Sequence, residues 1–256
     1  MRIDLNCDLG ESYGSFKVGM DKEVIPHVTS VNVACGYHGG DPVVMEETVK
    51  MAVQSGAAIG AHPSFPDLMG FGRRDMKLTL SEAYAYVKYQ LGALYAFART
   101  NGVELQHLKA HGALYNMAGR DITMATALAK AIKDFDSQML LLGLPNSKME
   151  EAAGECGIGY VSEFFADRAY NDDGSLVARS LEGSVIHDSG LAVQRVIRMV
   201  KEGVVETYKG GLLRLNCSSV CVHGDNKDAV EFVKNIRNSL EKEGVEAVNM
   251  KKVLGL

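Results

Sequence analysis

The chain has 256 residues, of which 46% are hydrophobic, and 27 lysines and arginines stand against 32 aspartates and glutamates, which gives a formal net charge of -5. This length and apolar content suffice for one large core, so we expect a single domain over residues 1–256. The basic residues are spread along the chain and form no runs, which argues against nucleic acid and anionic membranes as partners.

The beginning of the chain has the pattern of a strand. No basic segment leads into an apolar stretch, and no apolar stretch is long enough to cross a membrane. We therefore expect a cytoplasmic location. The five cysteines include no CxxC pair, so we expect reduced thiols and neither a disulfide framework nor a zinc ribbon.

Short apolar runs alternate with longer segments of helical periodicity, which is typical of βαβ units and a parallel sheet. The seven expected strands lie at residues 2–8, 30–35, 57–61, 105–110, 138–143, 159–166 and 212–222. The last is long enough to bend or to hold a bulge. Periodicity alone does not separate a deformed (β/α)7 barrel from an open doubly wound sheet, and we favour the barrel. The loops at 63–77 and 167–187 are long enough to act as lids.

Two helices are particularly well marked. The first is expected over residues 81–99, where Thr79 and Glu82 can form a capping box. The second is expected over residues 225–244, with apolar residues at helical spacing. Both should pack outside the sheet.

Polar residues gather where the expected strands end, and α/β folds bind ligands beyond the carboxyl ends of their strands. The six ends carry Asn6, Asp8 and Glu11; Asn32, Cys35, His38 and Asp41; His62; Lys109 and His111; Glu163, Asp167 and Arg168; and His223 and Asp225. We expect five of these six ends to converge on one mouth.

Four of the seven histidines, His38, His62, His111 and His223, each follow an apolar run by one or two residues. One such histidine is usually a buried cap of a strand, but four of them favour a functional site. With Asp8 they are the expected catalytic residues, because imidazole and carboxylate suit acid–base chemistry near neutral pH. Asp8, His38, His62 and His111 could instead supply a divalent metal site. No HxH or HExxH spacing supports that interpretation, so we rank it below metal-free catalysis.

Six further polar residues at the same strand ends are expected to bind the substrate: Asn6, Glu11, Lys109, Asp167, Arg168 and Asp225. Lys109 and Arg168, together with Arg179, would hold a carboxylate or a phosphate, although surface salt bridges are the ordinary role of such residues. Nothing in the sequence marks a cysteine as an activated nucleophile. No GxxxxGK[ST] or GxGxxG loop is present, so any nucleotide would need a different kind of site.

Six segments, taken in order, resemble the signatures of the LamB/YcsF (lactam utilisation) family. They are Asp4-Leu5-Asn6-Cys7-Asp8-Leu9-Gly10-Glu11, the segment 32–38 with Gly40-Asp41, Gly60-Ala61-His62-Pro63-Ser64, the segment 109–116, the segment 163–168 and Cys221-Val222-His223-Gly224-Asp225. The resemblance covers essentially the whole chain. Gly39 and Ala110 depart from the family pattern, but neither change removes a candidate catalytic side chain.

The resemblance implies the deformed (β/α)7 barrel of the glycoside hydrolase and deacetylase type. It also implies a component of an ATP-dependent 5-oxoprolinase, which acts with two partner subunits to open the lactam 5-oxoproline (pyroglutamate) to L-glutamate. ATP is then an expected cofactor, bound on this chain or on a partner. Two alternatives stay open: a metal-dependent amidohydrolase or deacetylase that works without ATP, and a non-catalytic scaffold subunit.

Overall fold

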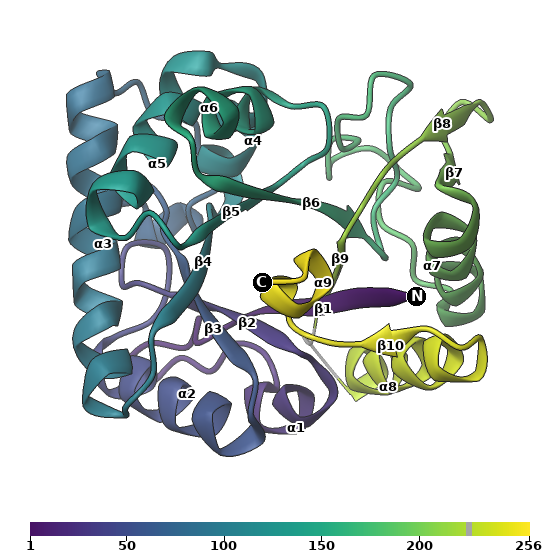
Figure 1. Cartoon of the computed structure of the whole chain (residues 1–256), viewed down its shortest axis with the longest axis horizontal. Coiled ribbons are helices and arrows are strands. Elements are labelled where there is room, and N and C mark those ends of the chain that lie inside the picture. The colour runs from purple at the N-terminus through teal and green to yellow at the C-terminus, as the bar shows by residue number, and fades with distance from the viewer. Residues whose placement is uncertain (224–226) are drawn as a thin grey trace.

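The computed structural model describes residues 1–223 and 227–256, and its central element is a closed barrel of parallel strands (Figure 1). Around the barrel the strands follow in the order β1 (Arg2–Leu9), β2 (Ser30–Ala34), β3 (Ala58–His62), β4 (Leu105–Lys109), β5 (Leu140–Gly143), β6 (Gly159–Phe165) and β9 (Ser219–Val222). Hydrogen bonds between β9 and β1 close the ring. The expected seven-stranded barrel is therefore confirmed.

Helices surround the barrel, as Figure 1 shows. They are α1 (Asp21–Val24), α2 (Pro42–Ser55), α3 (Leu80–Thr100), α4 (Gly112–Arg120), α5 (Ile122–Phe135), α6 (Lys148–Cys156), α7 (Ser189–Glu202), α8 (Lys227–Lys242) and α9 (Met250–Leu254), with 3-10 turns η1 (Ile25–His27) and η2 (Leu68–Gly70). The capping box of Thr79 and Glu82 is present at the start of α3, as predicted. The expected start of the last long helix, at Asp225 and Asn226, lies outside the described residues.

The strand expected over residues 212–222 is two strands. β8 (Leu212–Arg214) pairs antiparallel with β7 (Val204–Glu206) in a small separate sheet, and only β9 belongs to the barrel. The side chain of Leu212 is largely exposed, whereas every residue of β9 is buried, so one apolar run serves two different environments. A short strand that was not expected, β10 (Glu246–Ala247), pairs with the first residues of β1.

The interior of the barrel is polar and hydrogen-bonded from strand to strand. Along β1, Asp4, Asn6 and Asp8 share one face, because side chains alternate across a strand. Asp4 accepts hydrogen bonds from the hydroxyl of Ser30, at 2.6 Å, and from that of Ser219. Burial raises the pKa of Asp4 to about 6, which its hydroxyl partners only partly offset. The hydrophobic core lies outside this interior, between the strands and the helices.

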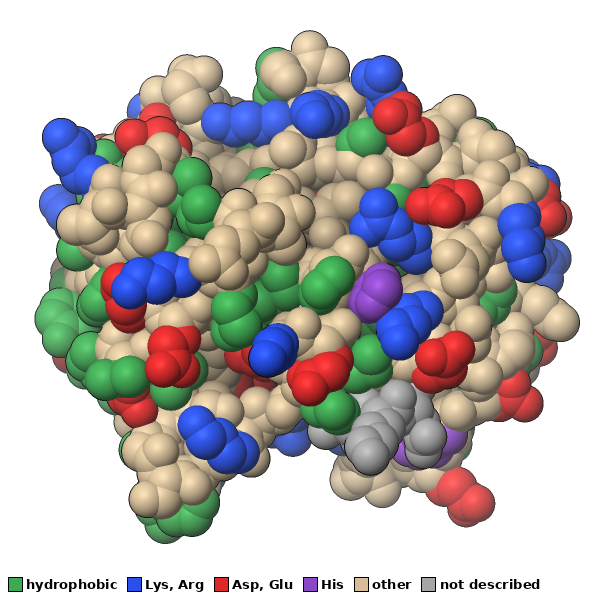
Figure 2. Space-filling model, turned by 90° about the horizontal axis from the view of Figure 1, so that it is seen from below, with side chains coloured by type: hydrophobic (Ala, Val, Ile, Leu, Met, Phe, Trp, Pro, Cys, Tyr) green, Lys and Arg blue, Asp and Glu red, His purple; other side chains and the backbone are tan. Residues whose placement is uncertain are grey.

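The N-terminal end of the barrel is closed. Met250 of α9 forms a buried cluster with Leu140, Leu142 and Val161 of the strands, and α9 lies across the barrel in Figure 1. The open mouth is therefore at the carboxyl ends of the strands. None of the described helices combines the length and the apolar character that a membrane crossing needs. On the face drawn in Figure 2, acidic and basic side chains are interspersed.

Candidate active site

A cavity of about 800 Å³ opens at the carboxyl ends of the barrel strands. Residues from β1, β3, β4 and β9 or just beyond them line it, together with the two long loops that were expected to be lids. The lining includes Asp8, Glu11, His62, Phe71, Arg73, Lys109, His111, Arg168, Arg179 and His223. Five of the six predicted strand ends therefore contribute side chains to one mouth.

A buried ion network forms the floor of this cavity on one side. The Lys109 side chain is almost fully buried, and its Nζ lies 3.0 Å from Asp8 Oδ1 and 3.1 Å from Glu163 Oε2. The same ammonium donates to Asn6 Oδ1 at 3.2 Å and to Cys221 Sγ at 3.1 Å. Burial favours the neutral amine, but Asp8, Cys221 and Glu163 outweigh it and raise the pKa of Lys109 well above its usual value. Lys109 is thus a fixed positive charge at neutral pH.

Asp8 connects the network to the histidines. Its Oδ1 accepts from Lys109 and, at 2.8 Å, from Asn32 Nδ2, and its Oδ2 lies 3.4 Å from His62 Nε2. Burial alone raises the pKa of Asp8, but the charges of His62 and Lys109 hold that pKa well below its usual value. Asp8 therefore stays ionised at neutral pH.

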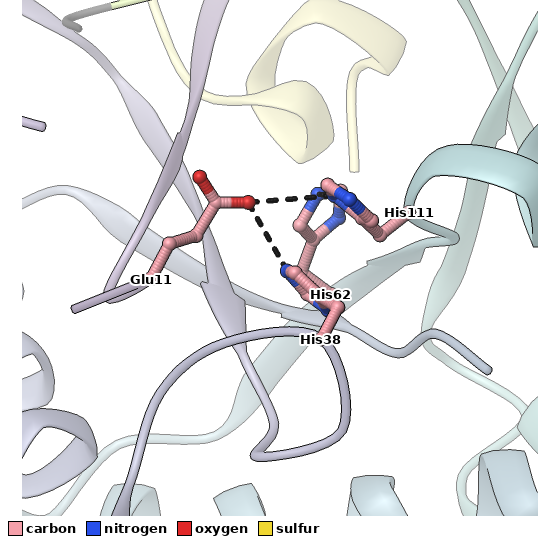
Figure 3. A group of neighbouring side chains, drawn as sticks. All are labelled: Glu11, His38, His62 and His111. Carbon is pink, nitrogen blue, oxygen red and sulfur yellow. Dashed lines mark hydrogen bonds and ion pairs between the residues drawn. The ribbon is translucent and has the colours of Figure 1, made fainter. Parts of the chain in front are cut away.

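On the other side of the cavity floor, three histidines and one carboxylate form a tight cluster of Glu11, His38, His62 and His111, called here the histidine cluster (Figure 3). The carboxylate of Glu11 lies 3.1 Å from His38 Nε2 and 3.4 Å from His111 Nδ1. The His38 and His111 rings stack with centroids 3.7 Å apart. Burial lowers the pKa of His38 and of His111 well below the usual value, and burial raises the pKa of Glu11.

Backbone carbonyls fix two rings of this cluster from outside. His62 Nδ1 lies 2.7 Å from the carbonyl oxygen of Lys109, and His111 Nε2 lies 2.9 Å from that of Phe71. The loop after β3 therefore takes part in the site through its main chain. His62 Nε2 and His111 Nδ1 then face each other at 3.0 Å.

His223 stands opposite the cluster, after β9. Its Nδ1 lies 2.8 Å from Asp167 Oδ2, and its Nε2 points toward Asp8 Oδ2 at 3.8 Å. Burial disfavours the charged ring, but Asp167 outweighs it and raises the pKa of His223 well above its usual value. The site thus holds a charged imidazole beside Asp8 and neutral imidazoles, His38 and His111, beside Glu11.

The family comparison agrees with this arrangement of strand-end residues. The model of the LamB/YcsF family matches residues 3–255. The chain belongs to the LamB/YcsF family. The predicted resemblance is therefore confirmed over essentially the whole chain.

Members of the LamB/YcsF family with similar sequences carry one name, that of the A subunit of 5-oxoprolinase. The protein of this name from Campylobacter jejuni subsp. jejuni (strain 81-176) is 56% identical over 245 residues, which cover 96% of each chain. Its namesake from Alkaliphilus metalliredigens is 54% identical over 99% of each chain, and that of Pyrococcus abyssi is 52% identical over the full length of both.

Solved structures agree with the barrel of this family member. The lactam utilization protein of Thermus thermophilus superposes with a TM-score of 0.92 at 47% identity, over 97% of this chain and 99% of that one. The peptidoglycan deacetylase PdaC of Bacillus subtilis superposes with a TM-score of 0.51 at 10% identity, over 99% of this chain and 91% of that one. The second similarity concerns the fold alone, and it supports the deacetylase type of barrel.

The LamB/YcsF chain places most of the predicted site residues around one cavity. Asn6 is fully buried below the mouth and does not line the cavity, and the ammonium of Lys109 is already held by two carboxylates. Arg168 lines the cavity, but its guanidinium donates to the carbonyls of Val177 and Ser184 in its own loop. Burial lowers the pKa of Arg168 to about 10. Asp225 lies outside the described residues.

Two features of the site were not assigned from the sequence. Glu163 was noted at a strand end but given no role, and it is the second carboxylate partner of Lys109. The carbonyl of Phe71 holds His111, and no side-chain pattern marks a backbone contact of this kind. The signal available for Glu163 was an acidic residue at an inward position of a buried strand.

Proposed function

We propose that this chain is the component of an ATP-dependent 5-oxoprolinase in which the lactam ring of 5-oxoproline is opened to L-glutamate, and that it works with two partner subunits. The proposal rests on the name shared by similar full-length relatives and on the chemistry of the cavity. In that cavity, carboxylates and imidazoles from successive strand ends surround a space large enough for a small ring compound.

The observation that carries the proposal is the pair formed by Asp8 and His223. One carboxylate with a lowered pKa and one imidazole with a raised pKa lie 3.8 Å apart on the wall of the same cavity. Environments that drive two titratable groups apart are typical of acid–base pairs. In our proposal Asp8 orients water and accepts its proton, while protonated His223 supplies a proton to the ring nitrogen as the C–N bond breaks.

The proton balance closes within this pair. After ring opening Asp8 is protonated and His223 is neutral, and transfer between Asp8 Oδ2 and His223 Nε2 restores both groups. Asp167 holds Nδ1 of His223, so that Nε2 faces the cavity in the charged ring. Arg73, Arg168 and Arg179 on the cavity wall are the groups we expect beside the substrate carboxylate or a phosphoryl group, in place of Lys109.

ATP has a clear chemical use in this reaction. A lactam amide is stabilised by resonance, and the five-membered ring recloses readily, so hydrolysis is slow and weakly driven. We propose that phosphorylation of the lactam oxygen activates the ring carbon for attack by water. If the lactam oxygen is labelled with oxygen-18, the label should appear in inorganic phosphate, and its absence there would exclude the phosphorylated intermediate.

The experiment for the function itself is glutamate release from 5-oxoproline, measured with and without ATP and with and without the two candidate partner subunits. We expect release only when ATP and both partners are present. Release that needs neither ATP nor partners would favour a metal-dependent amidohydrolase. Release by the partners and ATP alone, without this chain, would contradict a role in catalysis.

A further inference from the structure

We propose that Glu11, His38, His62 and His111 bind one first-row divalent transition-metal ion, with Zn²⁺ as the best match to the donors. Each residue comes from the end of a different one of the first four barrel strands, and their donor atoms all lie within 4.8 Å of one another (Figure 3). The inference stands on hydrogen-bond geometry. It deepens the proposed function, on which its catalytic meaning rests, because the ion would lie at the floor of the same cavity.

The hydrogen-bond partners of His62 and His111 determine where each ring carries its hydrogen. A carbonyl oxygen can only accept, so His62 Nδ1, beside the carbonyl of Lys109, carries a hydrogen. His111 Nε2, beside the carbonyl of Phe71, carries one for the same reason. In the neutral rings the lone pairs therefore lie on His62 Nε2 and His111 Nδ1.

These two lone pairs face each other at 3.0 Å. With no hydrogen between them the contact is repulsive, and the Glu11 carboxylate adds negative charge 3.4 Å from His111 Nδ1. His38 Nε2 reaches the same carboxylate oxygen at 3.1 Å. A cation at the centre turns this repulsion into attraction, so the described cluster is built to surround a positive charge.

The spacing of the donor atoms suits a metal ion. Zn–N bonds of about 2.0–2.1 Å in a tetrahedron place neighbouring ligand atoms about 3.3 Å apart. The corresponding distances here are 3.0 Å between His62 and His111, 3.1 Å between His38 and Glu11, and 3.4 Å between His111 and Glu11. Mg²⁺ and Ca²⁺ prefer oxygen ligands, whereas three imidazoles and one carboxylate are the donors of zinc and its neighbours.

The surroundings of the cluster are also those of a metal site. Ligating histidines in proteins donate their second ring N–H to a carbonyl or a carboxylate, which fixes the ring and its tautomer. The carbonyls of Lys109 and Phe71 do this for two of the three rings. Glu11, His62 and His111 line the cavity, so a bound ion would be open to a small ligand on that side.

A neighbouring group of Asp8, Cys221 and His223 also has donor atoms within 4.8 Å of one another. The ammonium of Lys109 already lies 3.0 Å from Asp8 and 3.1 Å from Cys221. That positive charge occupies the position that an ion would need. The metal is therefore assigned to the histidine cluster and not to this second group.

The test uses the full-length chain, stripped with a chelator and titrated with Zn²⁺ by calorimetry, with the metal content after dialysis measured by mass spectrometry. We expect one Zn²⁺ per chain. Glu11→Gln and His111→Ala should each weaken the Zn²⁺ Kd by at least about 100-fold, since loss of an outer-shell partner alone costs 10–100-fold. His187→Ala, which removes an exposed histidine outside the cluster, should leave the Kd unchanged.

A second measurement needs no variant, in case a substitution prevents folding. In the Co²⁺-loaded wild-type chain we expect visible absorption bands of a four-coordinate ion and three paramagnetically shifted, exchangeable imidazole N–H signals. Absence of stoichiometric Zn²⁺ binding would overturn the proposal. So would an unchanged Kd in folded Glu11→Gln and His111→Ala proteins, or an imidazolium proton shared by His62 and His111 that Zn²⁺ does not displace.

The two proposals fail in different ways. Zn²⁺ bound at the cluster, with no glutamate release under any combination of ATP and partners, would overturn the proposed function and leave the metal site standing. Glutamate release by a complex whose chain binds no Zn²⁺ would overturn the metal site and leave the function standing.

Discussion

The two halves of the cavity floor treat charge in opposite ways. On one side Lys109 lies between Asp8 and Glu163, so its positive charge is matched within hydrogen-bond distance. On the other side His62 and His111 present lone pairs to each other beside Glu11. The first arrangement is complete without a ligand, whereas the second is favourable only with a cation at its centre. One half therefore stabilises the barrel, and the other half is built for binding.

The largest expected effect on stability follows from breaking the completed half. Lys109→Met leaves Asp8 and Glu163 buried without their cation, and loss of one partner of a buried pair typically costs about 3–5 kcal/mol. The free energy of unfolding in urea measures this loss. Lys50→Met removes a comparable lysine from an exposed pair on α2 and should change that free energy very little. Equal stabilities of the two variants would contradict the difference drawn between the two pairs.

A smaller effect is expected from crowding the binding half. Gly72 has a φ of +63°, and a Cβ there would overlap Ser64 Oγ and lie 2.8 Å from the Cβ of His38. Gly72→Ala should therefore displace the cluster and weaken Zn²⁺ binding. Gly102 has a similar φ of +75° but open space around it, so Gly102→Ala carries the backbone strain of about 1–2 kcal/mol without the clash.

Calorimetric Zn²⁺ titration separates the two glycine variants. Zn²⁺ affinity should fall in Gly72→Ala and stay at the wild-type value in Gly102→Ala. If both variants bind Zn²⁺ as the wild type does, the close packing of the loop at Gly72 does not hold the cluster in place.

How much of this was predictable depends on whether the signal was local. The strands with buried side chains, the capping box at Thr79 and the gathering of histidines at one mouth follow from residue patterns along the chain. The division of residues 212–222 between two sheets does not, because both halves are apolar and only the tertiary structure exposes Leu212. That the chain is a single domain stays a prediction.

The metal ligands illustrate the same limit. The sequence grouped Asp8 with His38, His62 and His111, whereas the described cluster contains Glu11 in its place. Asp8 lies next to this cluster, but its Oδ1 accepts from Lys109 and Asn32. Which of two nearby carboxylates joins the histidines depends on how β1 and the loop after it are placed, and residue types alone do not specify that.

The smallest expected effect concerns His107, which is buried in the barrel and hydrogen-bonded to Asn32 Oδ1 at 2.6 Å. Burial lowers the pKa of His107 to about 3, against about 6.5 in an unfolded chain. Between these values the unfolded state binds one more proton, so stability is lost as the pH falls from about 6.5 toward about 3, by about 1.4 kcal/mol per pH unit.

Urea unfolding of the wild type and of His107→Gln at several pH values in this window measures that slope. The variant keeps a donor for Asn32 but has no proton to gain, so its stability should depend less steeply on pH. Parallel curves for the two proteins would mean that His107 is not held neutral in the folded chain.

The most direct measurement of the central claim, that the barrel mouth performs the ring opening, is glutamate release by the assembled complex carrying Asp8→Asn. The Asn side chain keeps the shape of Asp8 but cannot accept a proton from water, so we expect turnover to fall by about 10²–10⁴-fold while the complex still assembles. Asp75→Asn, at the rim of the same cavity, should turn over normally. Full glutamate release by an assembled Asp8→Asn complex would contradict the account.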